Sequence, residues 1–145
     1  MLKHILVATD GSSLSTDATR KAVTFASKLG ARITAVHVIQ PFAVVTFSPE
    51  MLEDTEAQYL ERSRRRATEI LAEVAAIATA ANVPCETVTM VHDHPYEAIL
   101  STAKATDCDM IAMASHGRRG IQATIIGSET QKVLTHSKLP VLVFR

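Results

Sequence analysis

Five short apolar segments, each bounded by turn-forming or polar residues, constrain the fold of this chain more than any other feature. They are rich in β-branched residues and lack a clean alternation of apolar and polar positions, which is typical of strands buried on both faces of a sheet. The expected strands are His4–Ala8, Arg32–Ile39, Cys85–Val91, 109–113 and 140–144.

Helical patterns fill the intervals between these strands. In the segment 15–29, apolar residues recur at steps of three and four, and Gly30 follows at the position where helices commonly end. A longer pattern of the same kind predicts a helix over about 52–81. A third helix is expected to start at Pro95, and a fourth follows Ser128.

The alternation of strands and helices predicts one α/β domain over residues 1–145. We expect a doubly wound, five-stranded parallel sheet in the order 3-2-1-4-5, with helices on both faces and a Rossmann-like or flavodoxin-like topology. Ligands of such sheets bind beyond the carboxyl ends of the strands, where the strand order reverses. This point lies between the first and fourth strands, so Thr9 and Asp10 should face the segment 114–117.

Charge and cysteine content exclude several classes of partner. Lys and Arg together number 15, as do Asp and Glu, so a neutral chain of this kind has no bulk attraction for nucleic acid or for an anionic membrane. No apolar segment is long enough to span a membrane, and the first residues lack the apolar core of a signal peptide. Cys85 and Cys108 are far apart in the sequence, which favours a reducing cytoplasm.

A glycine-containing loop follows the fourth expected strand. Nine residues separate Gly117 from Gly127, and Gly127 directly precedes the fourth expected helix. A helix start offers converging N–H groups to a phosphate, glycine allows close approach, and Ser128 could cap the helix or donate its hydroxyl. We therefore expect a nucleotide whose phosphates lie on the segment 117–128, although the loop is neither a Walker loop nor a dinucleotide fingerprint. The alternative is that the glycines only permit turns.

Several segments, in order along the chain, resemble the universal stress protein family. The C-terminal signature of that family is similar to MASHGRRG (113–120), IGS (126–128) and LPVLVFR (139–145), and further matches are ILVATDGS (5–12), VHV (36–38) and PYEAIL (95–100). The resemblance covers essentially the whole chain.

One branch of this family binds ATP and carries the pattern G-x2-G-x9-G-[ST]. In this chain the second and third glycines are Gly117 and Gly127, the last position is Ser128, and Ala114 replaces the first glycine. The methyl group of Ala114 would crowd a phosphate or ribose if the backbone there required a positive φ. The resemblance implies ATP, ADP or AMP as the ligand.

The resemblance also implies roles for individual residues. Asp10 should face the ribose or a Mg²⁺ ion between the phosphates, and the alternative is a turn or N-cap aspartate. The remaining expected binding residues are Ala8 and Thr9 in the crevice, Val38 at the adenine, Met113 and Ala114 at the end of the fourth strand, His116 beside the phosphates, and the amides of Gly117, Gly127, Ser128, Glu129 and Thr130. The carboxylate of Glu129 is expected to point outward, away from the phosphates.

Three further segments suggest a partner subunit, a lid or a metal ion. The final strand would expose an unpaired edge, and the resemblance implies a homodimer through Val141–Phe144. The connection 40–51 carries Phe42 and Phe47, which either pack back on the domain, form a lid over the ligand or cover a partner subunit. His92 and His94 could bind a metal, although a solvent-facing loop is the simpler interpretation.

The sequence thus favours a cytoplasmic, ATP-binding regulatory protein. One alternative is slow Mg²⁺-dependent ATP hydrolysis involving Asp10, His116 or Ser128, and another is a nucleotide-free dimeric scaffold, which Ala114 favours. No catalytic set is apparent, because Ser115 and His116 are neighbours whose side chains need not meet.

Overall fold

The predicted sheet is confirmed. A computed structural model describes residues 1–42, 55–117 and 126–145. Five parallel strands pair in the order β3-β2-β1-β4-β5. They are β1 (His4–Ala8), β2 (Arg32–Ile39), β3 (Cys85–Val91), β4 (Met110–Ala114) and β5 (Val141–Phe144).

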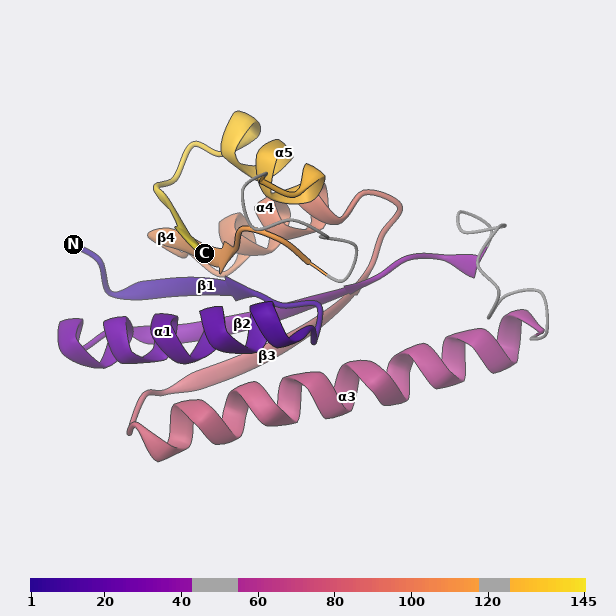
Figure 1. Cartoon of the computed structure of the whole chain (residues 1–145), viewed down its shortest axis with the longest axis horizontal. Helices are drawn as coiled ribbons and strands as arrows, with labels where there is room; N and C mark the ends of the chain where they lie inside the picture. Colours follow the sequence, from indigo (N-terminus) through magenta and orange to yellow (C-terminus); the bar gives the residue numbers. More distant parts are fainter. Residues whose placement is uncertain (43–54, 118–125) are drawn as a thin grey trace.

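Helices cover both faces of this sheet. Figure 1 shows α1 and α3 on the lower side of the strands and α4 and α5 above them. The helices are α1 (Ser13–Leu29), α3 (Glu56–Ala80), α4 (Pro95–Ala105) and α5 (Ser128–His136). Because every strand is parallel, the carboxyl ends of the strands form one edge of the sheet, the carboxyl edge, and their amino ends form the opposite amino edge.

Two helices begin at residues other than those predicted, because side chains cap them. Helix α1 starts at Ser13 instead of residue 15, since the hydroxyl of Ser12 accepts a hydrogen bond from the Ser15 amide at 3.2 Å. Helix α3 starts at Glu56, where Thr55 and Gln58 form a reciprocal capping box. Residues 52–54 of the predicted helix lie outside the described residues.

Two strands also differ by one residue from the prediction. Strand β4 runs over Met110–Ala114, and Asp109 instead uses its carboxylate to accept the backbone amides of Lys3 and His4. Strand β5 starts at Val141, because Pro140 has no N–H group and contributes only its carbonyl, which accepts from the Ile111 amide at 3.0 Å.

The core forms on both faces of the central strand β1. Ile5 and Val7 pack in a cluster with α1 and α3, whereas Leu6 and Ala8 pack in a second cluster with α4 and α5. All four side chains are buried, which explains why the sequence of this strand shows no alternation. Burying each large side chain contributes about 1.5–3 kcal/mol.

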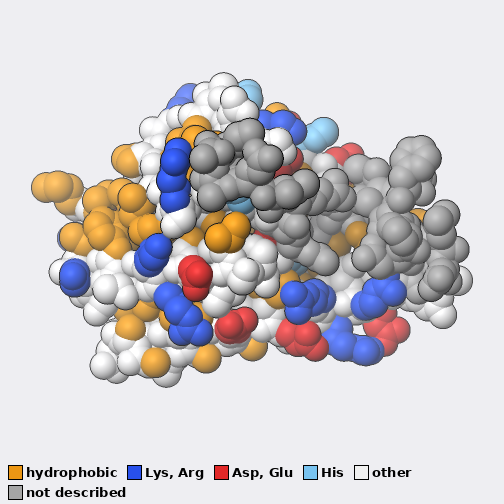
Figure 2. Space-filling view, viewed as in Figure 1, with side chains coloured by type: hydrophobic (Ala, Val, Ile, Leu, Met, Phe, Trp, Pro, Cys, Tyr) orange, Lys and Arg blue, Asp and Glu red, His pale blue; other side chains and the backbone are white. Residues whose placement is uncertain are grey.

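The surface carries charges of both signs. Figure 2 shows acidic and basic side chains interspersed over α3, and Arg65 pairs with Glu61 at 3.1 Å as their spacing predicts. Within the described part of the chain, no helix combines the length and the apolar character needed to cross a membrane.

Candidate functional site

The ends of β1 and β4 meet at the carboxyl edge, as the strand order predicts. The two strands are paired up to Val7 and Ala112. Beyond them, the carboxylate of Asp10 lies directly against Gly117, where a Cβ atom built on the glycine would overlap Asp10 Oδ2. Only a residue without a side chain allows the two loops to approach this closely.

The turn between β1 and α1 fixes the Asp10 carboxylate. Asp10 Oδ1 accepts hydrogen bonds from the Ser12 amide at 3.0 Å and from the Ser15 hydroxyl at 2.8 Å. Gly11 adopts a φ of +79° and faces the Ile70 side chain of α3. Asp10 is therefore a turn aspartate, the alternative considered for it, while its Oδ2 atom faces the junction with Gly117.

The start of α5 is held on the end of β4 by two hydrogen bonds. The Gly127 amide donates to the Ser115 carbonyl at 2.7 Å, and the Thr130 hydroxyl donates to the Ala114 carbonyl at 2.9 Å. Gly127 has a φ of −61°, which any residue can adopt. A Cβ atom on Gly127 would lie 3.2 Å from the Ser115 carbonyl oxygen, so close packing, and not the dihedral angle, favours glycine here.

Helix α5 differs from its neighbours at its first turn. Gly127 occupies the N-cap position, so Ser128 is the first helical residue and not the cap that the sequence suggested. By contrast, Ser12 caps α1, and the Glu129 carboxylate reaches the Tyr96 amide in the first turn of α4. The amides in the first turn of a helix have no intrahelical partners, so those of α5 can serve a bound anion.

Glu129 is directed toward α4. Its Oε2 accepts from the Tyr96 amide at 3.1 Å, and its Oε1 lies 3.4 Å from Lys132 Nζ. These contacts give the carboxylate partners on α4 and α5, consistent with the expectation that it turns away from the phosphates. The bond to Tyr96 links residues 33 positions apart, so no local pattern in the sequence indicates it.

The side chains of Ser115 and His116 meet, a contact that the sequence left open. The Ser115 hydroxyl lies 3.0 Å from His116 Nδ1, and both residues are buried. The other ring nitrogen, His116 Nε2, is buried and has no hydrogen-bond partner among the described residues. A buried polar atom of this kind calls for a partner, and a ligand phosphate could provide one. No carboxylate of the described chain orients this pair as a catalytic triad requires.

The apolar residues expected at the site belong mainly to the core. Ala8 and Met113 are 8% and 7% exposed and pack with Val38 in the cluster beneath α4 and α5. Their side chains therefore contribute to the core. Ala114 is the last residue of β4 and is not among the residues with positive φ, so its methyl group introduces no backbone strain.

Other candidate groups lie apart from this junction. His92 Nδ1 accepts from the His94 amide at 2.9 Å, and the described residues contain no group of three side chains that could hold a metal ion. Burial raises the pKa of the Cys85 and Cys108 thiols, which makes both poor nucleophiles at neutral pH.

A shallow groove lies on the opposite face of the sheet, between α1 and α3. It is lined in part by Thr9, Gly11 and Ile70 and leaves essentially no room for a water molecule. Ligand pockets are well-formed cavities, so this groove does not offer a nucleotide site.

The expected lid is described only at its start. Phe42 packs against Tyr59 of α3, with ring centroids 5.5 Å apart, and the Tyr59 hydroxyl donates to the Gln40 carbonyl at 2.8 Å. Phe42 thus folds back on the domain. Phe47 lies outside the described residues, and the lid stays a prediction.

The fold defines a doubly wound α/β domain whose strand order reverses between β1 and β4. The sequence pattern of the Universal stress protein family matches residues 1–145, and the chain belongs to this family. A universal stress protein of Thermus aquaticus is 34% identical over 146 residues, with both chains covered completely.

Solved structures share the fold. The universal stress protein UspA from Lactobacillus plantarum superposes with a TM-score of 0.82 at 23% identity, covering 99% of this chain and 98% of that one. A universal stress protein in complex with cAMP gives a TM-score of 0.73 at 22% identity, with 99% and 97% covered. The universal stress protein from Archaeoglobus fulgidus in complex with dAMP gives 0.68 at 20% identity, with both chains covered completely.

Proposed function

We propose that this protein binds an adenine nucleotide, ATP or its relatives ADP and AMP, at the carboxyl edge of the sheet and acts as a regulator in a stress response. The observation that carries this proposal is the uncapped first turn of α5, which starts against the β4 loop beside the buried, unpartnered Nε2 atom of His116. Regulation requires that the nucleotide favour one conformation or assembly over another.

The phosphates occupy the first turn of α5 in this proposal. The amides of Gly117, Ser128, Glu129 and Thr130 donate to the phosphate oxygens, and His116 Nε2 supplies a further polar contact. Hydrogen bonds to a charged group contribute about 1.5–3 kcal/mol each, so a few such bonds account for micromolar affinity. The glycines at 117 and 127 allow the loops that carry these amides to pack closely against Asp10 and against the Ser115–His116 backbone.

The nucleoside lies toward β1 and β2. The Asp10 carboxylate accepts from the ribose hydroxyls, and the Ser12 amide and Ser15 hydroxyl, which donate to Oδ1, hold it in place. The adenine edge meets backbone groups at Thr9 and Val38. A Mg²⁺ ion would share its oxygen ligands between Asp10 and the phosphates, since the described residues offer no complete ligand set of their own.

Similarity to liganded relatives supports the class of ligand. Two of the structures with this fold hold cAMP and dAMP, which are adenine nucleotides with one phosphate. In this chain Gly117 and Gly127 lie at the edge between β1 and β4, where this proposal puts the nucleotide.

We also propose a cytoplasmic homodimer formed through Val141–Phe144. Strand β5 pairs only with β4 within the described sheet, and its four residues are half-buried, so its second edge is available to a second copy. Light scattering at micromolar concentration should give twice the mass of one chain. A monomer under these conditions would contradict the dimer.

The direct test of the proposed function is to denature the purified protein and to identify any released nucleotide by mass spectrometry, followed by calorimetric titration of the nucleotide-free chain with AMP, ADP and ATP. We expect binding in the micromolar range for at least one of them. If no adenine nucleotide is released on denaturation and none binds in the titration, the proposal is wrong.

Slow ATP hydrolysis is a second candidate, favoured by the contact between Ser115 and His116. Release of labelled phosphate that is abolished in Asp10→Ala, at a nucleotide concentration that saturates this variant, would support it. ATP recovered intact after prolonged incubation would support the regulator.

A further inference from the structure

His37, on β2, forms a hydrogen bond that none of the functions above uses. Its Nδ1 atom lies 2.9 Å from the backbone carbonyl oxygen of Thr9, and its side chain is half-buried. A carbonyl oxygen can only accept, so Nδ1 carries the hydrogen and donates it. The tautomer at this nitrogen is therefore fixed by the contact itself.

This bond lies at the position where the backbone pairing of β1 and β2 ends. The last backbone bond between these segments runs from the Thr9 amide to the Val36 carbonyl at 3.1 Å. The next acceptor along β1, the Thr9 carbonyl, is taken by the His37 side chain. His37 thus extends the attachment of β1 to β2 by one residue, up to the beginning of the turn at Asp10.

The same bond constrains Asp10. The Thr9 carbonyl and the Asp10 amide belong to one planar peptide group, so fixing the carbonyl direction also fixes the orientation in which the chain enters Asp10. The Asp10 carboxylate then accepts from the Ser12 amide at 3.0 Å and lies against Gly117. If this peptide rotated, the Asp10 carboxylate would move relative to Gly117, with which it is in close contact.

We infer that His37 is a positioning residue of the nucleotide site, which holds the Thr9–Asp10 peptide so that the Asp10 carboxylate faces the junction with Gly117. This inference rests on the proposed function for its effect on ligand affinity. The geometric part, the control of the turn by His37, holds for the chain without ligand.

The first test compares His37→Asn with His37→Leu in the full chain, titrated with AMP and ATP. The side-chain amide of Asn places a donor close to the position of Nδ1, whereas Leu has a similar bulk and no donor. We expect His37→Leu to bind about tenfold more weakly and His37→Asn to stay within about threefold of the unmodified protein, in line with the loss of one buried hydrogen bond. His94→Leu removes an exposed histidine near the same edge and serves as the matched control.

The second readout needs no nucleotide. Hydrogen exchange of the Ser12 amide, which donates to Asp10, should be faster in His37→Leu and normal in His37→Asn. Equal exchange in all variants, or an Asn variant that behaves like Leu in both measurements, would overturn the inference. If the unmodified chain binds no adenine nucleotide, the proposed function fails, and the exchange of the Ser12 amide still decides the positioning role.

Discussion

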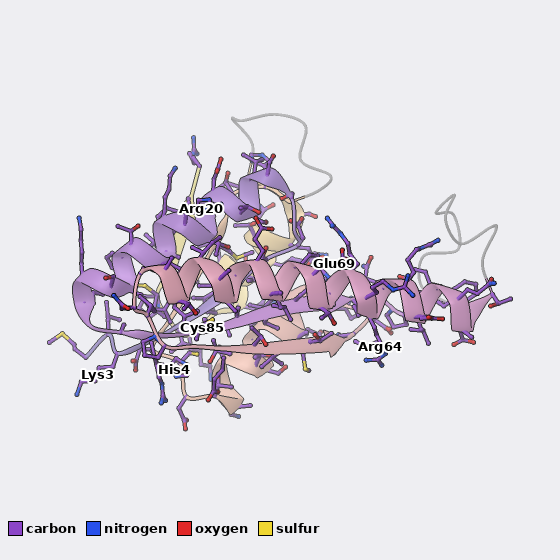
Figure 3. The ribbon with its side chains drawn as sticks, turned by 90° about the horizontal axis from the view of Figure 1, so that it is seen from below. Lys3, His4, Arg20, Arg64, Glu69 and Cys85 are labelled. Carbon is purple, nitrogen blue, oxygen red and sulfur yellow. The ribbon has the colours of Figure 1, made fainter. Side chains whose placement is uncertain are left out.

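The two edges of the sheet each hold a buried histidine, but their surroundings differ. At the amino edge, His4 Nε2 lies 2.7 Å from the Thr34 hydroxyl, and the Thr106 backbone lies near enough to affect the pKa of the ring. At the carboxyl edge, His116 Nδ1 contacts Ser115 and Nε2 has no hydrogen-bond partner among the described residues. Figure 3 shows His4 at the same end of the molecule as Lys3 and Cys85.

The backbone donors near the two histidines explain the difference. At the amino edge, Asp109 accepts the amides of Lys3 and His4, each at 2.9 Å, and these bonds lower the pKa of its carboxyl group. At the carboxyl edge, α5 starts at Gly127 without a side-chain cap. Within the described residues, two backbone donors of the amino edge are thus satisfied by a side chain, whereas no side chain caps the start of α5. Our proposal assigns stability to the amino edge and nucleotide binding to the carboxyl edge.

The largest effect is expected for Gly127→Val. Its side chain would start 3.2 Å from the Ser115 carbonyl oxygen and 3.4 Å from His116 Cα, and overpacking of this kind costs about 1–3 kcal/mol. The start of α5 must then move away from β4, and calorimetric titration should show a loss of adenine-nucleotide affinity of more than about tenfold.

Gly30→Ala is the matched control for this variant. Gly30 ends α1 with a φ of +66° and has open space around it, so alanine there adds backbone strain of about 1–2 kcal/mol without a clash. The control should lose stability and keep its affinity for nucleotide. Normal binding by Gly127→Val would show that the phosphates lie elsewhere.

The second effect is a pH dependence of stability caused by His4. Burial lowers the pKa of His4 below its usual value, and the positive charge of Arg32 lowers it further, while Asp109 and Glu86 act in the opposite direction. Above about pH 6.5 the histidine is neutral in both the folded and the unfolded chain, so its contribution is constant. As the pH falls below that value, the unfolded chain takes up the proton first, and the free energy of unfolding decreases.

This pH dependence is measured by urea unfolding between pH 7.5 and 5. In His4→Gln, which keeps a donor near Thr34, we expect a shallower decrease, the difference being at most about 1.4 kcal/mol per pH unit. If the free energy of unfolding decreases with the same slope in the unmodified protein and in His4→Gln, groups other than His4 cause the pH dependence.

A third, smaller effect concerns His116 in nucleotide binding. His116→Ala removes the Nε2 contact proposed for the phosphates, so affinity should fall about three- to tenfold, as is expected for one hydrogen bond. His116→Gln keeps a polar nitrogen and should recover part of the lost affinity. If His4→Gln weakens binding as much as His116→Ala, the separation of the two edges is wrong.

The smallest effect distinguishes the starts of α1 and α5. Ser12 caps α1 with its hydroxyl, so Ser12→Ala should lower the free energy of unfolding by about 1 kcal/mol. Ser128 is the first helical residue of α5 and caps nothing, so Ser128→Ala should change stability by less than about 0.5 kcal/mol and nucleotide affinity by about two- to threefold. Thermal unfolding and titration of both variants measure this difference.

The sheet was predictable because its signals are local and repeated. Apolar segments without alternation identify strands buried on both faces, and the order of the elements then limits the topology to few possibilities. The predicted helix starts were less accurate. At the start of α1, Ser12, Ser13 and Ser15 are all suitable caps, and which of them caps the helix depends on which hydroxyl reaches the free amide. The Thr55–Gln58 capping box was readable in the sequence and was missed.

The contacts of the site were predictable only in part. Strand order alone brings Asp10 to Gly117, whereas the bond between Glu129 and Tyr96 and the contact between Ser115 and His116 depend on side-chain rotamers that no spacing encodes. In the sequence, His37 was recognisable only as a polar residue near the end of a buried strand. Its hydrogen-bond partner is a backbone carbonyl that follows another strand.

The central claim, that the open edge of the fold binds a nucleotide through the amides of α5, is tested most directly by amide NMR of the full chain during titration with AMP and ATP. We predict that the largest shifts occur at Gly117, Ser128, Glu129 and Thr130, and that the amides of Lys3 and His4 do not change. Shifts concentrated at the amino edge, or none at the start of α5 while the nucleotide binds, would contradict the account.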